Sequence, residues 1–165
     1  MAILDQFQLK GKNAIVTGGG RGLGLGISEG LAEAGANVLM IGSGTSVEKA
    51  AEDFKAKGLS VHALRGNLLD QNAVPSIYTR ARDMLNGRVD ILVNNAGMQR
   101  RHPCEEFPLS DWTDVLNLNL NTVFQLCQLA GRDMIEIGYG KIINMASMLS
   151  FFGGYTVPAY AASKG

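Results

Sequence analysis

Short apolar runs alternate with longer stretches of mixed polarity along the chain. Five runs rich in β-branched residues predict strands at residues 14–17, 38–41, 61–64, 91–93 and 142–145. Between them, apolar residues recur at steps of three and four, which predicts helices near residues 23–34, 47–54, 74–84 and 111–137. Because the strand runs contain few polar positions, we expect strands that are covered on both faces of their sheet.

This alternation of strands and helices is typical of a parallel sheet with right-handed crossover connections. We therefore predict an α/β fold, a doubly wound parallel sheet of the Rossmann-like kind. The pattern contains no linker or repeat, so residues 1–165 are expected to form a single domain. In such folds, ligands bind beyond the carboxyl ends of the strands.

Charge and composition narrow the choice of partner. The chain has 15 basic and 15 acidic residues, so it offers no net positive charge to nucleic acid or to an anionic membrane. Residues 1–12 include Asp5 and no apolar signal segment, and no run reaches the roughly 18 apolar residues of a membrane span. We expect a cytoplasmic protein with a small-molecule ligand. Cys104 and Cys127 lack neighbouring metal-ligand patterns, which predicts reduced, core-packed thiols and no metal site.

A glycine-rich turn joins the first strand to the first helix. Residues 17–24 read Thr-Gly-Gly-Gly-Arg-Gly-Leu-Gly. Glycines at such a turn let backbone amides approach a pyrophosphate, whose charge the helix N-terminus then faces. The spacing differs from the commoner Gly-x-Gly-x-x-Gly pattern, so the cluster alone is also compatible with a plain sharp turn. The candidate cofactor-binding residues here are Gly18, Arg21, Gly22, Leu23 and Gly24.

The end of the second strand leaves the choice between NAD and NADP open. Dinucleotide sites often place a carboxylate there for the adenosine ribose hydroxyls, or an arginine where a 2′-phosphate must fit. Residues 42–44 are Gly-Ser-Gly, so Ser43 is the only polar side chain at this position. No acid excludes the phosphate, and Arg21 is the nearest candidate cation for it.

Tyr160 and Lys164 stand four positions apart, on one face if their segment is helical. A free tyrosine has a pKa of about 10, so a neighbouring ammonium is needed to make it a base at neutral pH. Ser147 follows the last predicted strand and can hydrogen-bond a reacting carbinol. A tyrosine and lysine at this spacing are often only a surface pair, so the combination of motifs carries the prediction.

Four features, in order and in context, resemble the short-chain dehydrogenase/reductase family: residues 17–24, residues 94–97 (Asn-Asn-Ala-Gly), Ser147 and the Tyr160/Lys164 pair. The resemblance covers essentially the whole chain. It implies nicotinamide-dependent oxidation of alcohols or reduction of ketones. It also implies a homo-oligomer for the full-length protein.

The resemblance implies roles for individual residues. Tyr160 is implied as general acid/base, Lys164 as the residue that holds the nicotinamide ribose and favours the phenolate, and Ser147 as the residue that orients the substrate. Asn119 is implied as the helical asparagine that supports a water relay to the lysine. Its neighbours Asn117 and Asn121 are alternatives at this position.

Two further segments are implied to border the cofactor. Residues 94–97 supply Asn94, Ala96 and Gly97 as candidate contacts, with a plain turn as the alternative. Asn67 and Leu68 stand where the family usually has an aspartate before an aliphatic residue at the adenine. Asn67 still carries an oxygen and an amide for that contact.

The substrate is suggested by residues 98–101 (Met-Gln-Arg-Arg) and residues 141–158. They resemble the sub-family of 2-deoxy-D-gluconate 3-dehydrogenases, also described as 2-dehydro-3-deoxy-D-gluconate 5-dehydrogenases, which implies an anionic keto-deoxy sugar acid and slightly favours NAD. A carboxylate needs a cation, and Arg100 or Arg101 follows a strand end beside the cofactor. The alternative is that both arginines pair with Glu105 and Glu106. We expect His102 to be a solvent-side loop residue.

Three functions stay open at this point. The first is an NAD(P)-dependent oxidoreductase of a keto-deoxy sugar acid, and the second is a related reductase of gluconates, polyols or acyl-carrier-bound 3-ketones. The third is an inactive dinucleotide-binding fragment, because Lys164 is the penultimate residue and the pattern predicts five strands where roughly six are usual. We expect a C-terminally incomplete chain that folds poorly and is inactive when expressed alone.

Overall fold

The computed structural model describes residues 3–165, so the first two residues of the N-terminal segment considered above lie outside the described residues. Its centre is a five-stranded parallel sheet in the order β3-β2-β1-β4-β5. The strands are β1 (Asn13–Thr17), β2 (Asn37–Gly42), β3 (Val61–Arg65), β4 (Ile91–Asn94) and β5 (Lys141–Asn144). The α/β prediction is confirmed, and each predicted strand is present with ends displaced by at most one residue.

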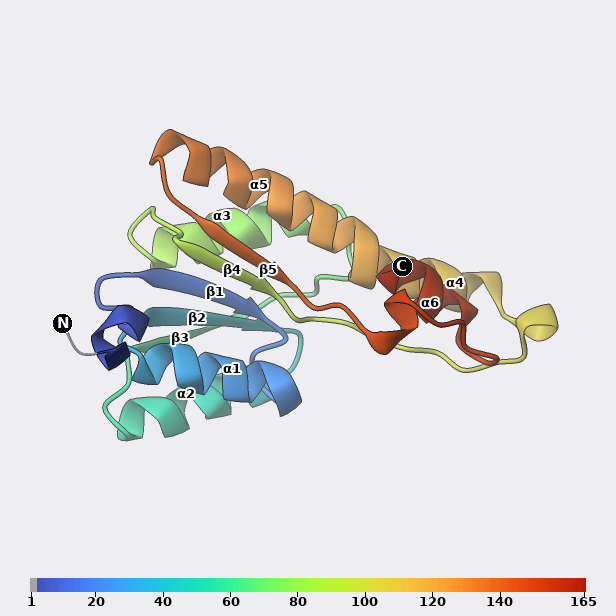
Figure 1. The fold of residues 1–165 in the computed structure, drawn as a ribbon, viewed down its shortest axis with the longest axis horizontal. Coiled ribbons are helices and arrows are strands. Elements are labelled where there is room, and N and C mark those ends of the chain that lie inside the picture. Colours follow the sequence, from blue (N-terminus) through green and yellow to red (C-terminus); the bar gives the residue numbers. More distant parts are fainter. Residues whose placement is uncertain (1–2) are drawn as a thin grey trace.

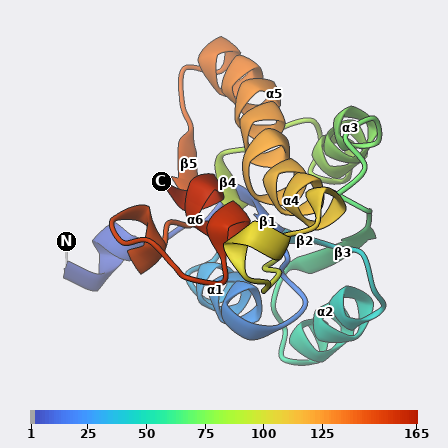
Figure 2. The ribbon, with the colours of Figure 1, turned by 90° about the vertical axis from the view of Figure 1, so that its right-hand side faces the viewer.

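Helices cover the sheet on both faces, as Figures 1 and 2 show. α1 (Gly22–Glu33) and α2 (Ser46–Ala56) lie on one face, and α3 (Val74–Met84) and α5 (Thr122–Glu136) lie on the other. Successive strand residues point to opposite faces, so Ile15 is buried against α3 and α5 whereas Val16 is buried against α1 and α2. Two separate cores therefore hold the sheet in place.

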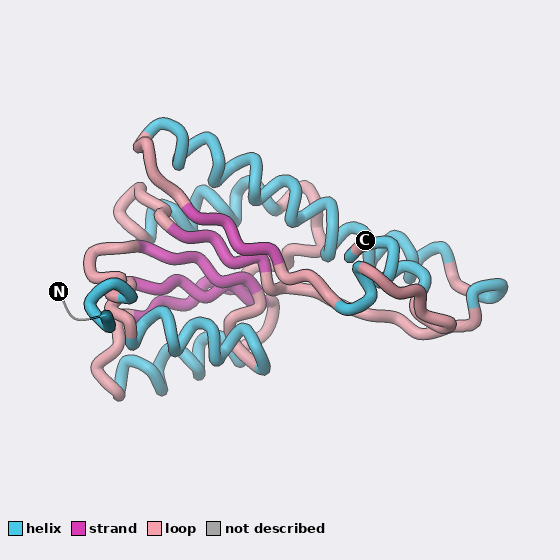
Figure 3. The backbone as a smooth tube through the Cα atoms, in the orientation of Figure 1, coloured by secondary structure: helices cyan, strands magenta, loops and turns pink. Residues whose placement is uncertain are grey.

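The carboxyl edge of the sheet carries a projecting lobe, visible at the right of Figure 3. It consists of the segments after β4 and β5, with α4 (Leu109–Leu116) and α6 (Pro158–Lys164). α4 continues through the π-helical segment η3 (Asn117–Asn121) into α5, which confirms the long predicted helix and adds a π turn to it. The short 3₁₀ segments are η1 (Ile3–Phe7), η2 (Cys104–Glu106) and η4 (Met148–Ser150). Within residues 3–165, no helix is long and apolar enough to cross a membrane.

Two burial predictions are wrong. All four residues of β5 are exposed, including Ile142 at 38% and Ile143 at 47%. β5 is an edge strand, and the helices pack mainly over β1 to β4, so its apolar run is not covered as expected. Cys104 is also exposed, because it lies in η2 on the projecting lobe, while Cys127 is half-buried; both thiols are free.

Asp90 lies at the opposite, amino-terminal edge of the sheet, directly before β4. Its buried carboxylate accepts hydrogen bonds from the backbone N–H of Asn13 at 3.0 Å and from Arg88 Nη2 at 2.7 Å, with Lys12 Nζ 3.8 Å away. Burial by itself would raise the pKa of Asp90. The hydrogen bonds from Arg88 and Asn13 and the charges of Arg88 and Lys12 outweigh it and hold the pKa below the ordinary value.

We expect Asp90→Asn to destabilise the protein by about 1.5–3 kcal/mol at neutral pH, because the charge-assisted hydrogen bonds are lost. The carboxylate stabilises the fold above its unfolded pKa of about 3.9, and this contribution disappears as the pH falls through the lower folded pKa. Urea titrations at several pH values measure it. A wild-type advantage that persists unchanged below the folded pKa would contradict the assignment.

Candidate active site

The turns after β1 and β4 are joined into one unit. The buried Thr17 hydroxyl accepts hydrogen bonds from the backbone N–H groups of Asn95 and Ala96, both at 3.0 Å. The Asn95 side chain in turn donates to the backbone oxygens of Thr17 at 3.0 Å and Gly18 at 3.3 Å. The glycine-rich turn is therefore fixed against the segment that follows β4.

Close packing requires glycine at several positions of this turn, and Gly18 and Gly24 are the two that pack against the segment after β4. Gly18 has a φ of +66°, and a Cβ there would lie 3.0 Å from Ala96 Cα. A Cβ on Gly24 would lie 2.2 Å from the Gly18 oxygen and 2.4 Å from Asn95 Nδ2. At Gly22, the N-terminus of α1, a Cβ would meet no described atom within 4 Å, so the backbone there is open to a ligand.

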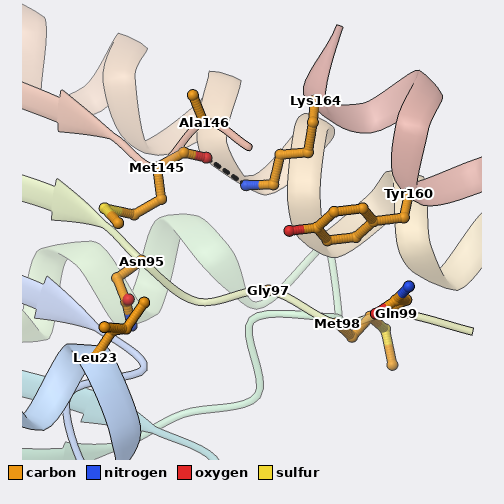
Figure 4. Close-up of a pocket in the computed structure, with 9 residues that line it drawn as sticks. All are labelled: Leu23, Asn95, Gly97, Met98, Gln99, Met145, Ala146, Tyr160 and Lys164. Carbon is orange, nitrogen blue, oxygen red and sulfur yellow. Dashed lines mark hydrogen bonds between the residues drawn. The ribbon is translucent and has the colours of Figure 1, made fainter. Parts of the chain in front are cut away.

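A cavity of about 270 Å³ opens next to this turn, shown in Figure 4. It brings together residues from four parts of the chain. They are Leu23 of α1; Asn95, Gly97, Met98 and Gln99 of the segment after β4; Met145 and Ala146 of the segment after β5; and Tyr160 and Lys164 of α6. The predicted residues Leu23, Gly97, Tyr160 and Lys164 thus meet in one place.

Tyr160 and Lys164 reach the cavity from the same helix. Lys164 Nζ lies 5.9 Å from the centroid of the Tyr160 ring and donates a hydrogen bond to the Met145 carbonyl. Burial lowers the pKa of Lys164 from its ordinary value. A half-buried cation is thereby held beside a phenol, at the carboxyl end of β5.

Asn119 is the buried asparagine of the π-helical segment. Its Oδ1 accepts from the Met98 N–H at 2.9 Å, and its Nδ2 donates to the Met98 carbonyl at 2.9 Å and to Ser163 Oγ at 3.1 Å. Asn117 and Asn121 bond to each other on the exposed side. The Asn119 side chain therefore connects the cavity wall at Met98 to α6.

Ser147 lies beside the cavity and is not among the residues that line it. It caps η4, and its Oγ accepts a hydrogen bond from the Leu149 N–H at 3.2 Å. Its neighbour Ala146 does line the cavity. The Ser147 hydroxyl keeps its proton free to donate to another acceptor.

Asn94 and Asn95 divide two roles. Asn94 is 2% exposed and donates to Asn144 Oδ1 at 2.9 Å, so it joins the carboxyl ends of β4 and β5. Asn95 lines the cavity, although the resemblance implies only Asn94, Ala96 and Gly97 as contacts in this segment. The available signal was its place directly after Asn94, because neighbouring residues of an extended chain point in opposite directions.

The predicted adenine and ribose contacts lie at the ends of β2 and β3. Ser43 and Asn67 are exposed, and Asn67 Oδ1 accepts from the Leu69 N–H at 3.2 Å. The Leu68 side chain is buried in the core, so only its backbone can face a ligand. Arg21 is exposed at the N-cap of α1.

The arginines after β4 do not line the cavity. Arg100 Nε lies 3.6 Å from Asp111 Oδ1, so the alternative that Arg100 pairs with Glu105 or Glu106 is wrong. These glutamates lie in the exposed η2 segment, whereas Asp111 lies in the first turn of α4. Arg101 is exposed and makes no ion pair with another described residue.

Comparison with known proteins places this geometry in a family. The profile described as short chain dehydrogenase matches residues 12–165. The chain is 46% identical over 161 residues to 2-dehydro-3-deoxy-D-gluconate 5-dehydrogenase of Bacillus subtilis, covering 97% of this chain and 62% of that protein. It is 42% identical to gluconate 5-dehydrogenase of Gluconobacter oxydans, covering 98% of this chain and 63% of the relative.

A solved structure supports the same placement. The crystal structure of a gluconate 5-dehydrogenase from Burkholderia cenocepacia in complex with NADP and tartrate has a TM-score of 0.92 and 38% sequence identity, covering 99% of this chain and 64% of that one. The chain therefore spans a little under two thirds of the length of these relatives. The profile match and these identities show that the chain belongs to the short chain dehydrogenase family.

Proposed function

We propose that the protein is an NAD(P)-dependent oxidoreductase that transfers hydride between a nicotinamide and a carbinol or ketone of a keto-deoxy sugar acid. One observation carries the proposal. Tyr160 and Lys164 enter the same cavity that Leu23 of the glycine-rich turn and Asn95 of the segment after β4 border. An acid/base pair and a dinucleotide cradle thus meet in one place, as hydride transfer next to proton transfer requires.

The residues present fit a dinucleotide. Close packing at Gly24 fixes the turn, a Cβ at Gly22 would meet no described atom within 4 Å, and the N-terminus of α1 offers backbone N–H groups to a pyrophosphate. Gly18, Gly22 and Leu23 would hold the pyrophosphate side, and Asn95, Gly97 and Lys164 would hold the nicotinamide side. When bound, the cofactor supplies the hydride donor or acceptor.

The chain's own residues perform the proton chemistry. The Tyr160 hydroxyl gives a proton to the substrate oxygen in reduction and takes it back in oxidation. The nearby Lys164 ammonium stabilises negative charge on the phenol oxygen. Ser147, which follows the cavity-lining Ala146, donates its hydroxyl proton in a hydrogen bond to the substrate oxygen, while its Oγ accepts from the Leu149 N–H. Asn119 holds Met98 and Ser163, and so fixes the cavity wall against α6.

The substrate class is proposed from the relatives' names and from Arg101. The Bacillus subtilis and Gluconobacter oxydans relatives are named for sugar acids. Arg100 is engaged by Asp111, whereas Arg101 follows it in the same segment with its charge uncompensated by a described acid. Arg101 is therefore our candidate for the substrate carboxylate.

We propose that both NAD and NADP are accepted. The segment after β2 carries Ser43 and no carboxylate until Glu48, which lies inside α2. The exposed Arg21 is available for a 2′-phosphate. The slight preference for NAD implied by the sub-family resemblance is measured in the same assay, by titrating each cofactor.

Turnover of a panel of substrates, followed at the nicotinamide absorbance, tests the proposed function. We expect turnover of 2-dehydro-3-deoxy-D-gluconate or gluconate to exceed that of a neutral polyol and of a 3-ketoacyl thioester. Arg101→Met should raise KM for the sugar acid about tenfold or more, because a charge-assisted hydrogen bond is lost, while Arg80→Met, at an exposed arginine of α3, serves as the control.

Other outcomes select the alternatives. A preference for the polyol or the thioester would assign the protein to another reductase of the family. Tight binding of either cofactor without turnover of any substrate would indicate a non-catalytic dinucleotide-binding protein. An unchanged KM in Arg101→Met would remove this arginine from the substrate site.

A further inference from the structure

The segment between β4 and α4 is tied down at two points that bracket three residues. At one end, Met98 is held on both backbone atoms by Asn119, which also bonds Ser163 of α6. At the other end, the His102 N–H donates to the Thr156 carbonyl at 3.1 Å, just before α6 begins. Residues 99–101 span the distance between these anchors. They include Gln99, which lines the cavity.

The second anchor is held by a carboxylate. His102 Nε2 lies 2.7 Å from Asp111 Oδ2, and since a carboxylate only accepts, the imidazole N–H donates. The His102 ring also packs edge-on against Phe107, with centroids 5.2 Å apart. Arg100 Nε approaches the other Asp111 oxygen at 3.6 Å. Asp111, in the first turn of α4, thus contacts the side chains at both ends of residues 100–102.

The surrounding segment has little else to order it. The η2 helix that follows contains no buried residue, and Gln99, Arg100 and Arg101 are all exposed. Ordering exposed backbone costs conformational entropy that only specific contacts offset. The side-chain contacts of His102 with Asp111 and Phe107, and of Arg100 with Asp111, are those that the structure shows for residues 99–102.

We propose that His102 and Asp111 are a positioning pair that holds residues 99–101 at the mouth of the cavity, so that substrate meets an ordered wall. Neither residue touches the reacting atoms. The pair keeps Arg100 occupied and sets the direction of Gln99 and Arg101. This inference rests on the proposed function in its kinetic consequence, whereas its structural consequence stands on the hydrogen bonds alone.

Steady-state kinetics of the protein test the kinetic consequence of this proposal. His102→Ala and Asp111→Ala should each raise KM for the carbonyl substrate about tenfold, with kcat and the cofactor Kd within about twofold of wild type, because a positioned loop contributes to binding and not to the chemical step. The double variant should equal either single variant, since the two residues act as a unit. His102→Gln should restore KM, because its amide N–H can still donate to Asp111. The matched control is Glu105→Gln in the exposed η2 segment, expected to behave as wild type.

Limited trypsin digestion tests the structural part without any substrate. Cleavage after Arg100 or Arg101 should be about tenfold faster in His102→Ala and Asp111→Ala than in wild type, and His102→Gln should be protected again, because cleavage follows local opening. Unchanged cleavage, failure of the glutamine variant to restore protection, or additive effects in the double variant would overturn the pair. So would a fall in kcat or cofactor affinity with unchanged KM. If no sugar acid is turned over, the proposed function fails while the digestion result still decides the positioning pair.

Discussion

Tyr160→Phe is expected to lower kcat by about 10²–10⁴-fold, the usual contribution of a positioned acid/base, while cofactor binding is retained. The substitution removes only the hydroxyl, and the ring stays where it borders the cavity beside Lys164. Without that hydroxyl, no other side chain lining the cavity offers an equivalent acid next to the ammonium. Steady-state kinetics with the best substrate of the panel and equilibrium titration of the cofactor measure the two quantities separately.

Tyr155→Phe is the matched control. Tyr155 is 82% exposed on the segment before α6 and does not line the cavity, so its variant should keep wild-type kcat. Equal losses in the two variants would indicate a general disturbance of the segment. Retention of full activity by Tyr160→Phe would remove Tyr160 from the chemical step and, with it, the central assignment of the proposed function.

The strands and their order follow from local signals. The apolar run from Ile91 to Val93 predicts a strand, and this strand, β4, is buried throughout. The same kind of run at Ile142 and Ile143 predicts a strand correctly but not its burial. Burial depends on which elements pack over a strand, and an edge position cannot be read from the strand's own residues.

The proximity of Tyr160 and Lys164 was predictable because it is local. Other contacts of the candidate site were not, because they are long-range. Tyr160 and Lys164 are one helical turn apart, so their spacing alone places them together. Asn95 follows β4 and bonds Thr17 at the end of β1. Arg100 and His102 pair with Asp111, although Glu105 and Glu106 are nearer to them in sequence. Proximity in sequence favoured Glu105 and Glu106 as partners, whereas in the structure the carboxylate that pairs with Arg100 and His102 is Asp111 of α4.

Gly24→Ala is expected to weaken binding of NAD and NADP by about 10²-fold, the scale on which a shift of about 1 Å disrupts a positioned ligand site. A Cβ at Gly24 would lie 2.2 Å from the Gly18 oxygen and 2.4 Å from Asn95 Nδ2. The first of these is a backbone atom in a turn held by Thr17 and Asn95, so the turn itself must move. Overpacking of this kind should also cost about 1–3 kcal/mol of unfolding free energy. Titration of cofactor fluorescence and urea denaturation measure the two effects.

Gly26→Ala in the same helix separates the steric argument from helix propensity. Gly26 is exposed, and a Cβ there would meet nothing within 4 Å. Replacing a glycine in a helix with alanine removes backbone entropy from the unfolded chain, so this variant should gain about 0.5–1 kcal/mol and bind both cofactors as wild type does. If Gly26→Ala weakened cofactor binding as much as Gly24→Ala, the loss would reflect α1 as a whole. If Gly24→Ala bound both cofactors normally, the turn would have to yield without cost, and its close packing would not be what shapes the cofactor site.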